Sequence, residues 1–234
     1  TLFKKIDTIN NLNYYLDNSD YTNIVENYYK NKILVNAFFE PSTRTSLSFE
    51  SSMYRLGGKV INFNTDTSSI NKGESFEDTI QTLSYYGDIL VLRHPNIEMI
   101  KKASNICNIP IINAGNGNGE HPTQALIDLY TIYKKFGNDF SSKRILFIGD
   151  ILNSRTIHSL LNLLHLYQNI KIYLLPFSNC EPNIEMLSDI SKNHNQDIYD
   201  IIKNYNDLNP NDYDIVYCSR LQKERININN KNKA

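Results

Sequence analysis

Arginine, histidine and hydroxyl side chains recur in this sequence shortly after short apolar runs. The residues concerned are Ser42, Thr43, Arg44 and Thr45 after the first run, and then Arg93, His121, Gln124, Arg155, Arg220 and Gln222. Guanidinium, imidazole and hydroxyl groups donate hydrogen bonds, and arginine binds carboxylate or phosphate oxygens in pairs. Their concentration at these points indicates a site for a compact ligand with several negative charges.

The strongest single pattern is the run of four donor residues from Ser42 to Thr45. We predict that they occupy a strand-to-helix turn, where the first amides of the helix lack internal partners and point toward an anion. The alternative is an ordinary helix cap with a surface arginine, which would be preferred for a bare Ser-Thr pair. Four consecutive donor residues after a buried strand favour an anion site.

His121 is predicted to begin a helix, because Pro122 follows it and proline suits the first helical turn. Its imidazole would donate to a developing oxyanion, and Gln124 would lie one turn further along the same face. A capping or core role for His121 is the alternative, and His94 is the other candidate for the oxyanion. The remaining histidines, His158, His165 and His194, are expected to be structural or on the surface.

Three polar residues in the second half of the chain form a further candidate group. Arg155 opens a helix after an apolar run, and Arg220 and Gln222 alternate with Leu221 at a strand end, so both would project to one face. Two arginines and an amide suit a dicarboxylate. The alternative for residues 220–225 is a solvated charge run, which composition alone favours. No spacing of His, Asp or Glu indicates a metal site.

The elements that would position these residues alternate along the chain. Seven short apolar runs have the composition of buried parallel strands, namely residues 33–39, 59–63, 88–93, 109–114, 144–149, 171–175 and 214–219. Stretches of helical period lie between them, and this alternation predicts an α/β fold with two doubly wound domains, each a parallel sheet flanked by helices. We expect the boundary near residues 136–139, giving domains 1–137 and 138–234; one domain would need an unusually large sheet.

Composition excludes several classes of protein. The 234 residues carry a formal net charge of −1, so the chain lacks the basic excess of proteins that bind nucleic acid or anionic membranes. No apolar run reaches the roughly 18 residues of a membrane span. The scattered Cys107, Cys180 and Cys218 form no disulfide framework or zinc motif, so we expect a reducing, cytoplasmic location. Because the sequence starts without Met, we also expect that upstream residues were removed, with any targeting segment.

Two motifs resemble those of the aspartate/ornithine carbamoyltransferase family. Residues 38–45 (FFEPSTRT) resemble its phosphate-binding motif and residues 121–126 (HPTQAL) its second motif, in the same order and spacing along nearly the whole chain. Residues 68–74 resemble the mobile loop of the aspartate branch, and residues 220–225 its aspartate-binding segment. The resemblance implies transfer of the carbamoyl group of carbamoyl phosphate to L-aspartate, giving N-carbamoyl-L-aspartate and phosphate, an early step of de novo pyrimidine biosynthesis.

The resemblance also implies a role for each candidate residue. The phosphate would be held by Ser42, Thr43, Arg44 and Thr45, the carbamoyl carbonyl would be polarised by Arg93, His121 and Thr45, and the carbamoyl nitrogen would be positioned by Gln124. Two residues, Ser68 and Lys72, would reach in from a neighbouring subunit. Aspartate would be bound by Arg155, Arg220 and Gln222, together with Lys72. Residues 1–137 would thus bind carbamoyl phosphate and residues 138–234 aspartate. The family is at least a homotrimer with shared sites and needs no cofactor or metal, and the sequence does not indicate a regulatory partner.

The sequence departs from the family pattern at two places. Ser46 stands where the family usually has a second arginine, which is mainly structural there, so we expect an effect on packing or assembly before chemistry. After Arg225 only a short polar tail follows, which we expect to be disordered, so the catalytic fold would be incomplete at its C-terminal end. Two alternatives therefore stay open: a carbamoyltransferase with another amino-acid acceptor, and a non-catalytic binding or assembly chain of the same fold.

Overall fold

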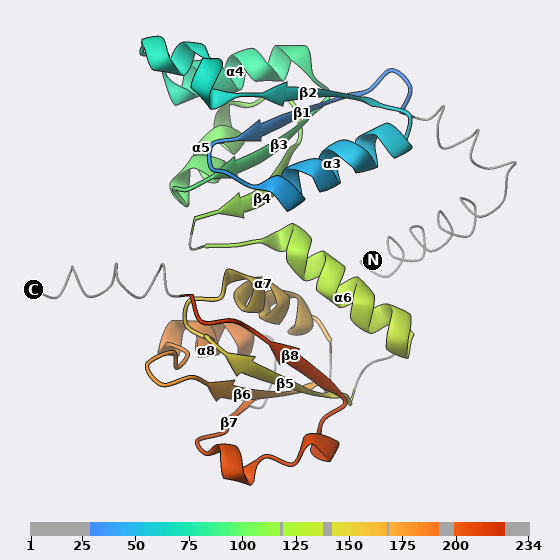
Figure 1. Cartoon of the computed structure of the whole chain (residues 1–234), viewed down its shortest axis with the longest axis vertical. Helices are drawn as coiled ribbons and strands as arrows, with labels where there is room; N and C mark the ends of the chain where they lie inside the picture. Colours follow the sequence, from blue (N-terminus) through green and yellow to red (C-terminus); the bar gives the residue numbers. More distant parts are fainter. Residues whose placement is uncertain (1–28, 118, 138–141, 168, 192–198, 223–234) are drawn as a thin grey trace, which may run out of the picture. The chain divides into compact units, whose positions relative to one another are not determined.

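The computed structural model describes residues 29–117, 119–137, 142–167, 169–191 and 199–222 of the chain. The chain divides into two compact units, Thr1–Gly119 and Glu120–Ala234 (Figure 1). His194 and the polar tail after Arg225 lie outside the described residues, so the expectations about them stay predictions.

The first unit is built on a parallel sheet of four strands in the order β2-β1-β3-β4. Its elements are, in chain order, β1 (Ile33–Phe38), α3 (Thr43–Arg55), β2 (Lys59–Phe63), the 3₁₀ turns η1 (Thr65–Thr67) and η2 (Ser69–Lys72), α4 (Phe76–Tyr86), β3 (Ile89–His94), α5 (Glu98–Ile106) and β4 (Ile111–Asn116).

Both faces of this first sheet are covered by helices, which explains why its inner strands read as continuous apolar runs. On β1, Leu34 packs into a cluster with Met53 of α3. The next residue, Val35, packs on the opposite face into a cluster with Ile80 of α4 and Ala103 of α5. Successive residues of a strand point to opposite faces, so a strand between two helical layers is apolar at most positions, with Asn36 as the buried polar residue of β1.

The second unit is also built on a parallel sheet of four strands, in the order β7-β6-β5-β8. Its elements are, in chain order, α6 (Pro122–Phe136), β5 (Arg144–Gly149), α7 (Arg155–Leu164), β6 (Lys171–Pro176), α8 (Ile184–Ser191), β7 (Tyr199–Ile201), the 3₁₀ turns η3 (Tyr205–Asp207) and η4 (Pro210–Asp212), and β8 (Ile215–Cys218).

Strand β5 and helix α7 both contribute fully buried residues to the second unit. Phe147 on β5 is fully buried, and so are Ile157 and Leu160 on α7. Helix α6 packs against α7 and buries Ala125 and Leu129. This pairing of α6 with α7 places α6 in the second unit.

The fold class is as predicted, with two α/β units that each contain a parallel sheet flanked by helices. The compact units divide at residues 119/120, whereas the predicted boundary at 137/138 lies after α6. The difference arises because α6 packs against α7, a contact that is not visible in local sequence. The assignment of residues 1–137 to carbamoyl phosphate and 138–234 to aspartate stays a prediction.

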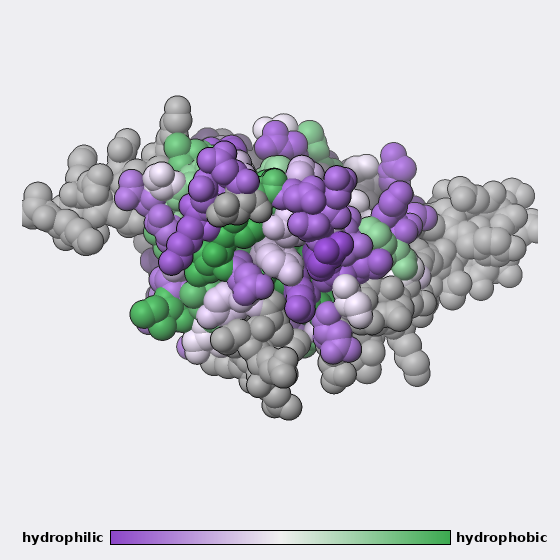
Figure 2. All heavy atoms as spheres, turned by 90° about the horizontal axis from the view of Figure 1, so that it is seen from below, coloured by the Kyte–Doolittle hydropathy of each residue, from purple (hydrophilic) through white to green (hydrophobic). Residues whose placement is uncertain are grey.

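On the face shown in Figure 2, many hydrophilic residues surround a green patch of apolar residues. Large apolar residues exposed in the second unit include Ile184, Leu166 and Tyr205. Within the described part of the chain, none of the helices has both the length and the apolar character needed to cross a bilayer.

Candidate active site

The turn between β1 and α3 carries the first group of candidate residues. Helix α3 begins at Thr43, with Ser42 as its N-cap in an extended conformation at φ −159°. The first turn-closing bond runs from the Ser46 amide to the Ser42 carbonyl over 3.3 Å, so the amides of residues 43–45 precede the intrahelical ladder. The Ser42 hydroxyl does not cap the helix, unlike that of Ser75, which accepts a bond from the Asp78 amide at the start of α4. The turn therefore presents amides and hydroxyls suited to an anion.

Ser46, where the family usually has arginine, takes part in a partly buried network with two asparagine side chains. Asn36 of β1 donates through Nδ2 to Ser46 Oγ over 2.9 Å and to Asn62 Oδ1 of β2 over 3.0 Å. Asn36 is only 2% exposed, and within the described chain its Oδ1 has no hydrogen-bond partner. The network ties the first turn of α3 to two strands of the sheet.

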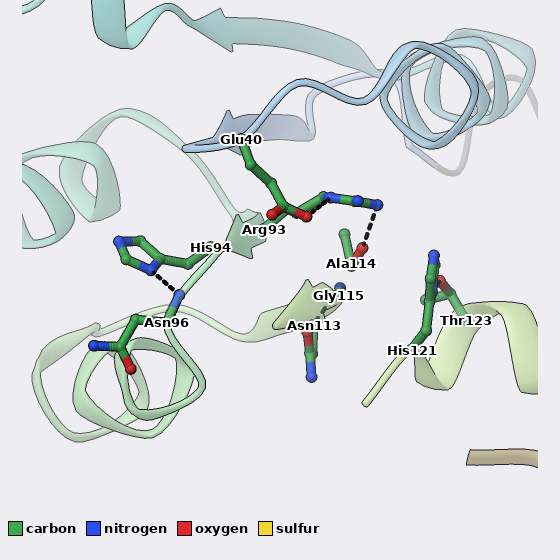
Figure 3. Close-up of polar contacts among 9 residues, drawn as sticks. All are labelled: Glu40, Arg93, His94, Asn96, Asn113, Ala114, Gly115, His121 and Thr123. Atoms are coloured by element: carbon green, nitrogen blue, oxygen red, sulfur yellow. Dashed lines mark hydrogen bonds and ion pairs between the residues drawn. The ribbon is translucent and has the colours of Figure 1, made fainter. Parts of the chain in front are cut away.

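Arg93 lies at the carboxyl end of β3, and its Cα is paired in register with that of Phe38 at the end of β1. Its Nε donates to Glu40 Oε1 over 2.6 Å, and the two side chains point toward each other in Figure 3. A longer contact of 3.5 Å runs from Nη1 to the Ala114 carbonyl. Arg93 thus lies at the same sheet edge as the β1–α3 turn, held by Glu40, a residue that our sequence argument did not single out.

His94 has a structural setting. Its ring packs against Phe39 and Phe76, with ring centroids 5.2 and 5.3 Å away, and its Nδ1 accepts a bond from the Asn96 amide over 3.0 Å (Figure 3). Burial lowers the pKa of this imidazole below its ordinary value. The neutral ring is therefore favoured, which suits packing in an aromatic cluster.

Ser68 and Lys72 lie in the connection between β2 and α4. The Ser68 hydroxyl donates to the Thr65 carbonyl over 2.8 Å, and Asn71 Nδ2 donates to the Asp66 carbonyl over 2.6 Å. Lys72 ends η2 and is exposed. These hydrogen bonds shape the loop. The role of Ser68 and Lys72 in a neighbouring subunit's site stays a prediction.

In the second unit, His121 is the N-cap of α6 and Pro122 is its first residue, as predicted. The His121 amide donates to Ser159 Oγ of α7 over 2.9 Å. The Ser159 hydroxyl in turn hydrogen-bonds the Glu120 carboxylate, which also accepts a bond from Asn162 Nδ2 over 3.0 Å. Side chains of α7 therefore hold the backbone at the start of α6.

Two further contacts shape the first turn of α6. The Thr123 hydroxyl lies 3.3 Å from His121 Nδ1 (Figure 3). Gln124 Nε2 donates to Asp128 Oδ1 over 3.0 Å, and Tyr217 of β8 donates its hydroxyl to Asp128 Oδ2 over 3.0 Å. Burial, with a contribution from the Asp128 charge, raises the pKa of Tyr217 to about 12. Sequence reasoning missed Asp128, although its spacing of four from Gln124 on a helix was available as a signal.

The fully buried carboxylate of Asp150 connects the two segments whose residues are the candidates for binding a dicarboxylate. Its Oδ1 accepts from the Asn153 amide over 3.0 Å, just before Arg155 opens α7. Its Oδ2 accepts from the Gln222 amide over 3.0 Å. The loop after β5 and the segment after β8 are thereby fastened together, which brings the neighbourhoods of Arg155 and Gln222 to one end of this sheet.

The expected strand geometry at Arg220 and Gln222 was wrong. Strand β8 ends at Cys218, so the alternation of a strand does not orient these side chains. Gln222 Nε2 instead donates to the Arg220 carbonyl over 3.5 Å, and Arg220 Nη1 donates to the Leu221 carbonyl over 3.3 Å. After the strand, the Ser219 amide donates to the Ile148 carbonyl over 2.8 Å, and the Gln222 amide donates to the buried carboxylate of Asp150.

Metal and thiol chemistry find little support in the part of the chain that the structure describes. No group of three or more His, Cys, Asp or Glu side chains there is arranged to hold a metal ion. The three cysteines are free thiols, and burial raises the pKa of Cys180 to about 11, which disfavours its thiolate.

Comparison with known proteins identifies the relatives of this chain. Residues 3–134 match the family model described as "Aspartate/ornithine carbamoyltransferase, carbamoyl-P binding domain". The aspartate carbamoyltransferase catalytic subunit of Methanococcus vannielii is 44% identical over 197 residues, an alignment that covers 83% of this chain and 63% of the relative. The chain therefore spans about 63% of the length of this relative.

Two solved structures have the same fold. Aspartate transcarbamoylase from Trypanosoma cruzi, in complex with carbamoyl aspartate and phosphate, is 41% identical with a TM-score of 0.75; the match covers 83% of this chain and 63% of that one. The catalytic subunit of the Methanocaldococcus jannaschii enzyme is 39% identical with a TM-score of 0.76, covering 96% of this chain and 74% of that one.

Proposed function

Because this chain belongs to the aspartate/ornithine carbamoyltransferase family, we propose that the protein transfers the carbamoyl group of carbamoyl phosphate to the amine of L-aspartate. The products would be N-carbamoyl-L-aspartate and phosphate, and the reaction would serve pyrimidine biosynthesis. Relatives that bear the name aspartate carbamoyltransferase, and solved relatives with carbamoyl phosphate or aspartate bound, support this choice of substrates.

The observation that carries the proposal is the β1–α3 turn beside the end of β3. There the amides and hydroxyls of residues 42–45 and the guanidinium of Arg93 share one edge of a parallel sheet. Ligands of open α/β sheets bind beyond the carboxyl ends of the strands. In our proposal Ser42, Thr43, Arg44 and Thr45 bind the phosphate group of carbamoyl phosphate.

The proposed chemistry is an attack by the deprotonated amine of aspartate on the carbamoyl carbon. The new C–N bond forms, the C–O bond to phosphate breaks, and the proton that the amine loses leaves with the phosphate. Arg93, His121 and Thr45 stabilise the negative charge on the carbonyl oxygen, and Arg44 and Lys72 offset the charge of the departing phosphate. These residues act by orientation and electrostatic stabilisation, and losing one oxyanion donor of this kind typically costs on the order of 10²–10³ in rate.

The aspartate carboxylates are assigned to the second unit. We assign the α-carboxylate to Arg155, at the start of α7, and the side-chain carboxylate to Arg220 and Gln222, after β8. Asp150 supports this assignment, because it fastens the Gln222 amide and the loop before Arg155 to one another. Arginine binds carboxylates through two parallel hydrogen bonds, which would fix the orientation of the substrate.

The active assembly is proposed to be a homotrimer whose sites are shared, with Ser68 and Lys72 acting on the neighbouring subunit's ligands. A mixture of Lys72→Ala and His121→Ala chains tests this sharing. Each variant alone should be inactive, whereas reassembled mixtures should regain activity at interfaces that combine two intact halves. Mixed oligomers that stay inactive would contradict a shared site.

The proposal is tested by measuring carbamoyl aspartate formation by the protein, with ornithine as the control acceptor. Product from aspartate and none from ornithine is the expected result. Citrulline formation would indicate another acceptor. Binding of carbamoyl phosphate without phosphate release, with any amino acid, would indicate a non-catalytic chain of this fold.

A further inference from the structure

Asp128 holds the side chain of Gln124 in one orientation. The two residues are four apart on α6, so their side chains lie on the same face. Gln124 Nε2 donates to Asp128 Oδ1 over 3.0 Å, while the other oxygen of the carboxylate accepts the Tyr217 hydroxyl over 3.0 Å. The carboxylate is therefore fastened from α6 and from β8 at once.

The chemistry of the two groups decides which end of the Gln124 amide faces Asp128. An ionised carboxylate only accepts hydrogen bonds, whereas an amide has a donating nitrogen and an accepting oxygen. The nitrogen must therefore face Asp128, and the Gln124 Oε1 atom is turned away from it. Among the residues that the structure describes, Oε1 has no hydrogen-bond partner. It is an acceptor left available for a ligand that donates.

We infer that Asp128 is a positioning residue that sets the specificity of the site for an acyl phosphate bearing an N–H donor. This inference rests on the proposed function, in which Gln124 faces the nitrogen of the carbamoyl group. The carbamoyl NH₂ donates to Gln124 Oε1, whereas the methyl group of acetyl phosphate, which has nearly the same shape, leaves this acceptor desolvated and unpaired. One such unmade bond lowers affinity by about tenfold or more.

The test compares the affinities of carbamoyl phosphate, acetyl phosphate and inorganic phosphate for the protein by calorimetry. The unmodified protein should prefer carbamoyl phosphate over acetyl phosphate by about tenfold or more. In Asp128→Asn the new amide can donate to Gln124 as well as accept from it, so Gln124 is free to turn its nitrogen toward the ligand. The preference should then fall by about tenfold, while affinity for inorganic phosphate stays unchanged.

Tyr217→Phe is the matched control, because it removes the other hydrogen bond to Asp128 and leaves the accepting carboxylate facing Gln124. It should keep the preference of the unmodified protein. An equal change in Asp128→Asn and Tyr217→Phe, or no change in Asp128→Asn, would overturn the inference and leave Asp128 a structural residue. If Asp128→Asn does not fold, Gln124→Met must abolish the preference, and its persistence would overturn the inference.

The same measurements separate this inference from the proposed function. An unmodified protein that binds neither acyl phosphate contradicts the proposed function and the inference with it. One that binds both with equal affinity is consistent with the proposed function and contradicts only the role of Asp128.

Discussion

Arg93 and Glu40 form an ion pair at the carboxyl edge of the first sheet, with Arg93 Nε only 2.6 Å from Glu40 Oε1. The Arg93 side chain is 11% exposed, so the guanidinium depends on protein groups in place of water. A backbone hydrogen bond next to the ion pair links the ends of β1 and β3, because the Phe39 amide donates to the Arg93 carbonyl over 2.8 Å. Glu40 therefore orients a residue that the proposed reaction requires.

Glu40→Ala is expected to lower the free energy of unfolding by about 1–3 kcal/mol, because it removes a charged acceptor from a largely buried guanidinium. Glu40→Gln keeps an acceptor and should cost less. Urea denaturation measures both changes, with Glu50→Ala of α3 as the control. A loss in the control as large as that in Glu40→Ala would show that the ion pair adds nothing.

Ser46→Ala is expected to cost about 0.5–1.5 kcal/mol of stability, because the Nδ2 atom of the buried Asn36 then loses its 2.9 Å bond to the Ser46 hydroxyl. Ser48→Ala, at an exposed position of the same helix, should be nearly neutral. Equal denaturation midpoints for the two variants would contradict a structural role for Ser46.

Stability should fall in acid partly through His94. Burial lowers the pKa of His94 below its ordinary value of 6.5, so the unfolded chain binds the proton first as the pH falls. The contribution of this residue is thus fully present above about pH 6.5 and is lost as the pH drops through the folded-state pKa. Urea midpoints measured between pH 7.5 and 5 should fall less steeply for His94→Gln than for the unmodified chain. Identical slopes would rule out His94 as a contributor.

Gly149→Ala is expected to destabilise the second unit far more than Gly137→Ala. Both glycines have positive φ, at +124° and +78°, but a Cβ on Gly149 would lie 2.2 Å from the Ser219 carbonyl oxygen, whereas one on Gly137 would meet nothing within 4 Å. Backbone strain alone costs on the order of 1–3 kcal/mol, and the overlap adds to it at Gly149. Thermal denaturation of the two variants checks this, and similar losses would contradict the close approach.

Asp150→Ala is expected to raise the KM for aspartate at least tenfold while leaving the affinity for carbamoyl phosphate nearly unchanged. The reason is that the Gln222 and Asn153 amides lose their buried acceptor, so the segments carrying Gln222 and Arg155 are released from one another. Steady-state kinetics with each substrate varied in turn measures the two effects, and the exposed Glu185→Ala of α8 is the control. Equal effects on both substrates would indicate general unfolding.

The strands that lie between two helical layers were predictable because burial on both faces makes most of their residues apolar. Strand β7 was not foreseen, since its three residues are mostly exposed and carry no apolar run. Helices α5 and α8 were not singled out either. The strand-to-helix turn at residues 42–45 and the helix start at His121 were predictable because both depend on consecutive residues.

The partners of the candidate site residues were not predictable in the same way. Glu40 meets Arg93 across 53 positions of sequence, and Asp150 meets the Gln222 amide across 72. Such pairs depend on which strands become neighbours in the sheet, and local patterns in a single sequence do not reveal the order of the strands.

The pairing of α6 with α7 has a practical consequence for dividing the gene. A fragment begun at residue 138 would omit α6 and uncover the surface of α7 that this helix contacts. A fragment ended at residue 137 would carry Ala125, Leu129 and Ile132 as an unprotected apolar stripe prone to aggregation. Expression of either half, or exchange of halves between relatives, should therefore cut between Gly119 and Glu120.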